Sequence, residues 1–385
     1  MNARLRFPVL MGVVALLALG CSTPEEGSIA FTGDISAANP SAGGEDAGSA
    51  SGDAPEPTPL DPATAQELQA SLAANPEGCE VLEARSCLLP FPSDAYTVED
   101  TSSTTGRRVD LPDGLVPNVD GAPLDPTEWN RNDGFSPSTP ILVHVPGLDA
   151  EQTALPGEGD IGMSTTSESA TVIVDLDNGQ RIPHWAELDQ RATDDADRTL
   201  ILRPAVSLGE TRRFGVALRD LKGADGEALQ APAAYRALRD NHPTEAPRIE
   251  ERREHFETMF QALASAGVNR ADTYLAWDFT VASAESLAGR MLTMRDDAMG
   301  RVGSTDAEIS VDEVRTDDLQ DGIEKIVEGT FEVPLYLEGD GSPGSRMNYD
   351  ESGDRPVANG TYTANFTCTV PAEAASDGGA RPVVY

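Results

Sequence analysis

Short runs of apolar and β-branched residues recur between residues 140 and 220, with polar turn residues between them. Such runs are typical of strands, and the pair Asn178-Gly179 between two of them is a strong hairpin signal. Turn residues separate the stretches at the spacing of a β-sandwich. We therefore predict strands at Ile141–Val145, Thr171–Leu176, Arg181–Ala186, Thr199–Arg203 and Arg213–Leu218.

Two helices are predicted from spacing and end signals. Asp61 can cap a short helix that has Pro62 at its first position and ends at Asn75-Pro76. A later stretch repeats apolar residues at helix spacing and stops at Gly267, a residue that commonly ends helices. The apolar residues of this stretch are Phe256, Met259, Phe260 and Leu263.

The segment Tyr274–Ser283 switches to a period of two. Leu275, Trp277, Phe279 and Val281 share one face, whereas Asp278 and Thr280 share the other. This pattern predicts a half-buried strand. Ser283 can then cap a further helix, in which the apolar residues form one stripe that we expect to fill a core. That stripe consists of Leu287, Met291, Met294 and Ala298.

The rest of the chain is predicted to be β-rich, with strands near 329–339 and 360–370. A last apolar run, Pro382–Tyr385, reads either as a closing strand or as the first strand of a domain that this chain lacks. The predicted fold class is mainly β with α insertions, or α+β. We expect an Ig-like β-sandwich with a short leading helix over 60–230, a helical segment with one strand over 231–304, and a second β-rich region over 305–385.

The N-terminus has the pattern of an export signal. Two arginines precede an apolar core from Phe7 to Leu19, so residues 1–20 are predicted to be a signal peptide. The Gly20-Cys21 pair resembles the lipobox of bacterial lipoproteins, which implies cleavage after Gly20 and a lipid anchor on Cys21. The alternative is an ordinary cleaved signal with an incidental cysteine. Residues 21–59 are rich in Gly, Ser, Pro and acid and are predicted to be a disordered tether.

The charge balance restricts the partners that the chain can have. There are 65 acidic against 28 basic residues, and the formal net charge is -37. Such a surface repels nucleic acid, so no nucleic-acid partner is expected. The membrane is expected as a partner only through the lipid anchor, and the protein is expected to be exported to the outer face of the bacterial cell envelope.

Three cysteines follow Cys21, in a compartment that is expected to be oxidising. Cys79 and Cys87 lie eight positions apart, so we expect them to form a disulfide rather than a zinc site. Cys368 is left over. It has either a partner elsewhere or a place as a buried free thiol on a strand.

No stretch carries a strong catalytic or cofactor signature. His144, His184, His242 and His255 have no metal-ligand spacing and are expected to be structural or surface residues. There is no nucleophile elbow, phosphate-binding loop or dinucleotide fingerprint. We therefore assign no catalytic residue, no metal and no cofactor to this chain.

Two resemblances add to this picture. The stretch around Leu202 to Gly226 is similar to bacterial Ig-like domains. Four longer phrases together resemble the N-terminal region of secreted bacterial α/β-hydrolase-type lipoproteins and are similar to virulence-factor lipase N-terminal domains. These phrases are Cys87–Thr97, Asp125–Asp149, Tyr274–Ser283 and Gly329–Tyr349.

The second resemblance implies a function. In that group a strand like Pro382–Tyr385 begins the hydrolase domain, and the oxyanion loop and the serine elbow follow it. The leading hypothesis is therefore a non-catalytic, membrane-tethered accessory region of a secreted esterase or lipase, with a hydrolase domain in cis. One alternative is an envelope lipoprotein whose Ig-like surface binds a polysaccharide or an envelope protein. Another is an enzyme built on acids such as Asp133 and Asp278, which no residue spacing supports. Residues Ile141–Pro146, Trp129 and Phe135 are either a contact face for a following domain or, as we expect, sandwich core.

Overall fold

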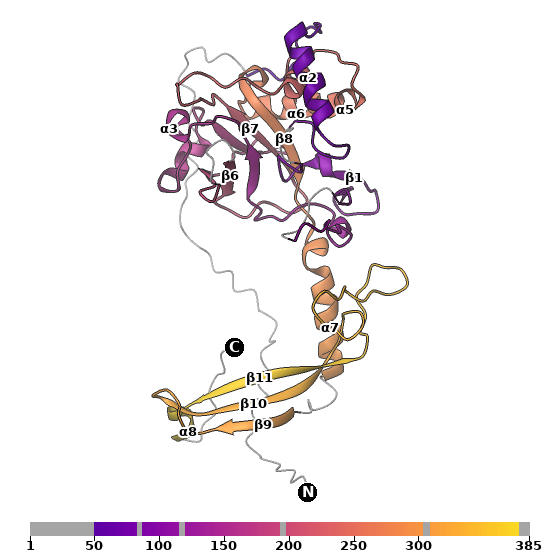
Figure 1. Cartoon of the computed structure of the whole chain (residues 1–385), viewed down its shortest axis with the longest axis vertical. Helices are drawn as coiled ribbons and strands as arrows, with labels where there is room; N and C mark the ends of the chain where they lie inside the picture. Colours follow the sequence, from indigo (N-terminus) through magenta and orange to yellow (C-terminus); the bar gives the residue numbers. More distant parts are fainter. Residues whose placement is uncertain (1–49, 83–86, 115–119, 193–197, 303–308, 377–385) are drawn as a thin grey trace. The chain divides into compact units, whose positions relative to one another are not determined.

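The computed structural model describes residues 50–82, 87–114, 120–192, 198–302 and 309–376. The chain divides into two compact units. We call Gly44–Leu287 the main unit, and the described residues from Ala288 to Ser376 the C-terminal unit (Figure 1). The boundary predicted at residue 230 does not separate these units, because a strand from beyond it completes a sheet of the main unit.

The main unit contains three antiparallel sheets, one of two strands and two of three strands, in the part of it that is described. The hairpin is β1 (Thr97–Glu99) with β2 (Arg107–Val109). The second sheet has the order β3 (Ile141–His144), β6 (Thr199–Pro204), β5 (His184–Leu188). The third has the order β4 (Thr171–Asp175), β7 (Arg213–Arg219), β8 (Thr273–Thr280). With its helices, the chain belongs to the α+β class, as predicted.

The predicted hairpin at Asn178-Gly179 forms its turn but not its second long strand. Gly179 has a φ of +72°, and one bridge joins Val174 to Arg181. Pro183 follows two residues later and has no N–H to donate, so the ladder with β4 cannot continue. The chain instead crosses over, and β5 begins at His184 in the other sheet, beside β6.

The helices of the main unit confirm the end signals of the sequence. The Asp61 side chain accepts hydrogen bonds from the N–H groups of Ala63 and Thr64, and the helix ends at Asn75. The helix stop at Gly267 has a φ of +79°. The α-helices are α2 (Pro62–Ala74), α3 (Ala150–Thr153), α4 (Ala233–Arg239), α5 (Pro247–Glu250) and α6 (Arg253–Ser265). Short 3₁₀ helices are η2 (Asp94–Tyr96), η3 (Trp129–Arg131), η4 (Glu158–Thr165) and η6 (Arg270–Asp272).

Strand β8 is buried along its whole length, so the prediction that it is half-buried was wrong. One face packs against α6, whose Leu263 approaches Gly215 of the neighbouring β7. On the other face the indole Nε1 of Trp277 donates to the Pro92 carbonyl at 2.9 Å. The segment around Pro92 therefore covers the face that the sequence pattern assigned to the core, while α6 covers the polar face.

The core of the described chain lies in the main unit. Every residue of the main hydrophobic cluster falls between Leu68 and Val281. Ile141, Val143 and Phe135 are buried there, which confirms their assignment as core, but Trp129 is 51% exposed and is not core. The large apolar side chains that are fully buried include Phe214, Tyr235, Phe256, Phe260, Trp277 and Phe279.

The last part of the predicted tether is folded. Ser51 and Gly52 accept hydrogen bonds from the backbone and the guanidinium of Arg270. A Cβ on Gly52 would lie 2.6 Å from the Phe260 carbonyl oxygen, so only glycine fits against α6 at this point. Residues 50–59 thus belong to the main unit rather than to a disordered tether. Residues 21–49 lie outside the described residues.

The C-terminal unit is a helix and a three-stranded antiparallel sheet. A π-helical turn (η7, Glu285–Gly289) leads into α7 (Arg290–Val302). The sheet has the order β11 (Thr361–Pro371), β10 (Ile323–Pro334), β9 (Ile309–Arg315), and α8 (Ala372–Ser376) follows it. The stripe of Leu287, Met291, Met294 and Ala298 was predicted to fill a core, but Leu287 is 43% and Met291 is 66% exposed, and the other two are only partly buried.

Candidate functional site

A polar pocket of about 350 Å³ lies in the main unit, next to the end of β8. Its wall is built by the β1–β2 hairpin with η2 before it, the turn after β4, and the turn before β7 with the first residue of that strand. The first turn of α6 and the last residue of β8 complete it. Its lining residues are Asp94, Glu99, Thr101, Thr105, Gly106, Arg107, Asp177, Thr211, Arg213, His255 and Thr280.

Asp278 lies under this wall and binds the side chains of Arg213 and His255. Antiparallel pairing of β7 with β8 sets Gly215 opposite Asp278 and Arg213 opposite Thr280. These four residues therefore share the face that α6 covers. The Arg213 Nε donates to one carboxylate oxygen of Asp278, and the His255 Nε2 lies 2.7 Å from the other.

The electrostatic state of Asp278 follows from these contacts. Burial raises its pKa, but the hydrogen bond from His255 and the positive charges beside the carboxylate lower the pKa by more, to about 2. Asp278 is therefore ionised at neutral pH. It holds the Arg213 guanidinium and the His255 ring at the pocket wall.

Asp94 is the second buried carboxylate of the site. Its two oxygens accept hydrogen bonds from the N–H and the hydroxyl of Thr280 at 2.8 and 2.7 Å. Arg107 lies 3.5 Å from the same carboxylate and is 26% exposed. Burial, together with the negative charge of Asp278, raises the pKa of Asp94 to about 6. The two carboxylates thus have pKa values on opposite sides of the ordinary value for aspartate.

The raised pKa of Asp94 predicts a change of stability with pH. The folded state binds the proton more tightly than the unfolded chain, so this group's stabilisation is complete below about pH 4 and is lost as pH rises through about 6. Asp94→Asn should remove this dependence, so the difference in unfolding free energy between variant and wild type should vary between these pH values by about 2–3 kcal/mol.

Urea unfolding at a series of pH values measures that difference. Asp100→Asn is the matched control, because the hydrogen bonds of Ser102 and Arg108 lower the pKa of Asp100 to about 2, below the window. The difference in unfolding free energy between Asp100→Asn and wild type should stay constant between about pH 4 and pH 6. A flat difference for Asp94→Asn as well would contradict the raised pKa.

Three of the four phrases that carry the hydrolase resemblance meet beside this pocket. Phe91 of the first phrase and Phe135 of the second pack edge to face with ring centroids 5.3 Å apart. Phe135 also bonds through its backbone to Thr280 and Ala282, which belong to the third phrase. A Cβ on Gly134 would lie 2.7 Å from the Ala282 nitrogen, so this approach requires glycine. The phrases form the framework that positions Asp94, Asp278 and Thr280.

The hypothesis of a site built on Asp133 and Asp278 is not supported by their contacts. The Asp133 carboxylate accepts the Ser283 N–H at 3.0 Å and fixes the turn after β8. Its backbone carbonyl accepts a hydrogen bond from the Thr105 hydroxyl. Asp133 is thus a structural support behind the pocket, whereas Asp278 lies under the wall and binds two residues that line it, Arg213 and His255.

No family model, no curated protein and no solved structure matches this chain. The site is therefore described by its own geometry. Across residues 50–376, wherever the placement is described, no group of three or more His, Cys, Asp and Glu side chains could hold a metal ion. Within the same part of the chain, no helix has the length and apolar character needed to cross a bilayer.

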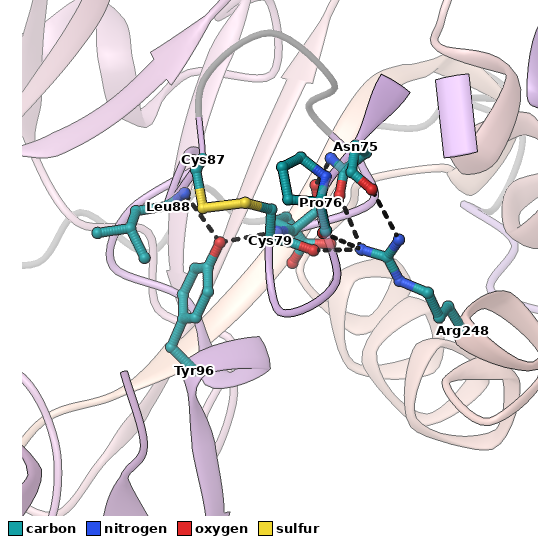
Figure 2. The surroundings of a disulfide bond; sticks show 8 residues. Asn75, Pro76, Cys79, Cys87, Leu88, Tyr96 and Arg248 are labelled. Atoms are coloured by element: carbon teal, nitrogen blue, oxygen red, sulfur yellow. Dashed lines mark hydrogen bonds between the residues drawn. A yellow bond between two sulfur atoms is a disulfide. The ribbon is translucent and has the colours of Figure 1, made fainter. Parts of the chain in front are cut away.

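The predicted disulfide is present (Figure 2). Cys79 and Cys87 are bonded, and the Tyr96 hydroxyl beside them accepts the N–H groups of Glu80 and Leu88 at 2.8 and 3.0 Å. Arg248 of α5 donates to the Cys79 carbonyl at 2.6 Å. Figure 2 shows how these bonds tie the disulfide loop to the adjacent segments. Burial, with the charge of Glu80, raises the pKa of Tyr96 well above its usual range.

The other predicted residues have mixed outcomes. Gly20 and Cys21 lie outside the described residues. Cys368 is a free thiol with an exposed side chain on β11, not a buried one. His184 is fully buried and bonds to the Thr171 hydroxyl and the Ile182 carbonyl, so it is structural as expected; burial lowers its pKa to about 4. His255 was expected to be structural or on the surface, yet it lines the pocket.

Proposed function

We propose that this chain is an exported, lipid-anchored accessory region of a secreted ester hydrolase, and that its C-terminal unit docks against the hydrolase domain in cis. The accessory region assists that domain by positioning or covering it. The chain itself is assigned no catalytic residue. The proposal joins the hydrolase resemblance of four sequence phrases to one feature of the structure, the lack of a core in the C-terminal unit.

That feature carries the proposal. Among the described residues from 288 to 376, Leu335 is the one large aliphatic or aromatic side chain that is buried. A small sheet needs an apolar face packed against other elements to be stable. Here, large apolar side chains on the helix and on both edge strands are about half exposed or more, which marks a surface that other protein covers. They are Met291, Leu292, Met299, Val311, Val314 and Tyr362.

Two further observations support the location and the fold. The signal-like N-terminus and the Cys79–Cys87 disulfide both fit an oxidising compartment outside the cytoplasm. The two three-stranded antiparallel sheets of the main unit draw five of their six strands from residues 60–230. They are the basis for proposing that this range is an Ig-like sandwich.

The native product of the gene provides the test. We expect the protein isolated from its own cells, with an antibody against residues 50–287, to react with a fluorophosphonate probe. Mass spectrometry should place the labelled serine in polypeptide joined to this chain but outside its 385 residues. A native product that carries no reactive serine would overturn the proposal. A labelled serine within these 385 residues would overturn the assignment of an accessory role.

A further inference from the structure

The proposed docking of the C-terminal unit does not involve the polar pocket of the main unit, so the function of this pocket is a separate question. We infer that the pocket between Arg107, Arg213 and Thr211 binds a neutral, hydroxyl-rich ligand, that is, a sugar unit. The inference does not depend on the proposed hydrolase, since every residue of the pocket lies in the main unit.

The two arginines are rigid donors. Arg107 is held by the Thr97 hydroxyl at 2.6 Å and by the carboxylate and carbonyl of Asp94. Arg213 is held by the Asp278 carboxylate, to which its Nε donates. Within the described residues the Nη1 group of each arginine has no hydrogen-bond partner. Both side chains are about a quarter exposed, so these N–H groups can donate to a ligand without first being reorganised.

The backbone at Thr211 is a second sign of a binding site. Thr211 has a φ of +60°, in the left-handed region, which a β-branched residue rarely adopts. Strained residues of this kind cluster at functional sites such as ligand clamps. Thr211 lines the pocket in this strained conformation, and Thr101 and Thr105 line it as well.

The chemistry of the lining selects the class of ligand. An anion is disfavoured because Asp94 and Asp278 neutralise the two arginines, while Glu99 and Asp177 add negative charge. A cation is disfavoured because the two buried carboxylates are already engaged by guanidinium groups. An apolar ligand would find no aliphatic or aromatic lining residue. A neutral polyol can accept from the arginines and exchange hydrogen bonds with the threonines and carboxylates.

The size of the pocket agrees with a small ligand. Its 350 Å³ lies at the lower end of the range of about 300–1,000 Å³ that is usual for small-molecule sites. The ligand could be a free sugar or one residue of an envelope polysaccharide. The two sources share the same hydroxyl chemistry, so the experiment must compare a monosaccharide with its oligomer.

Saturation-transfer NMR on the whole chain, without its signal peptide, tests the inference. The probes are glucose, galactose, mannose and N-acetylglucosamine, each with a linear trisaccharide of the same sugar; phosphate and spermidine serve as charged comparisons. We expect at least one neutral probe to bind with a Kd of about 1 mM or tighter. A trisaccharide that binds about tenfold more tightly than its monomer would identify a polysaccharide as the source.

Three variants locate the site. Thr101→Val removes one pocket hydroxyl, and Thr211→Gly removes another while relieving the backbone strain, so that a fold at least as stable as wild type is expected. The substitutions Thr101→Val and Thr211→Gly together should weaken sugar binding about tenfold. Thr258→Val, an exposed threonine of α6 outside the pocket, should leave binding unchanged. The inference is overturned if no neutral sugar binds, if phosphate or spermidine binds instead, or if the pocket variants bind as wild type does.

Discussion

Replacing Arg213 with Met is expected to lower the free energy of unfolding by about 3–5 kcal/mol. The substitution removes the guanidinium that lies against Asp278, whose side chain is 4% exposed. His255 remains as one partner, but the carboxylate loses the charge that helps to keep it ionised without water. Breaking a buried ion pair from one side is costly because the remaining charge stays buried.

The matched control is another arginine on the main-unit sheets. Arg203 of β6 forms an ion pair with Glu187 at 2.6 Å, and the two side chains are 41% and 47% exposed. Exposed pairs contribute about 0–1 kcal/mol, so Arg203→Met should change stability little. Urea unfolding followed by tryptophan fluorescence at neutral pH compares the two variants. Equal losses from both would contradict the central role of the Asp278 pair.

Local patterns in the sequence were sufficient to predict much of the main unit. Short apolar runs between turn residues located β4, β6 and β7 to within one or two residues, and the helix spacing with Gly267 located α6. Trp277 was assigned correctly to an apolar face, because its neighbours on alternate positions are apolar as well. Trp129 has no such periodic context, and it was wrongly expected to be core.

The pocket could not be predicted because its parts are far apart in the sequence. Asp94 bonds to Thr280 across 186 positions, and Arg213 bonds to Asp278 across 65. One signal was present: Asp278 is an acid between Trp277 and Phe279 in a predicted strand, and buried acids are rarely found without a partner. That signal could have indicated a charged partner for Asp278. It could not have identified Arg213 and His255 as those partners.

In the C-terminal unit the sequence pattern predicted elements but not their packing. Alternation located β11 to within one residue, the predicted strand near 329–339 matched only the second half of β10, and the stripe of Met291, Met294 and Ala298 correctly indicated a helix. A periodic apolar face predicts the element, but it does not show whether anything covers that face. Leu287 and Met291 stay exposed while Met294 and Ala298 are only partly buried, so the prediction of a methionine-filled core was wrong.

The absence of a core in the C-terminal unit predicts a large difference in amide protection. In the isolated 385-residue chain, amides of β8 should exchange only when the main unit unfolds globally. Amides of β10 are bonded on both sides in the sheet, but the sheet buries almost no apolar side chain. Their opening should cost several kcal/mol less, which corresponds to exchange roughly a thousandfold faster or more.

Hydrogen exchange followed by mass spectrometry, on this chain and on the native gene product, tests the central claim most directly. We predict fast exchange in β10 of the isolated chain and slow exchange in the same strand of the native product, with β8 slow in both. Equal, slow exchange of β8 and β10 in the isolated chain would show that the C-terminal unit is stable alone, and would contradict its completion by a docked domain.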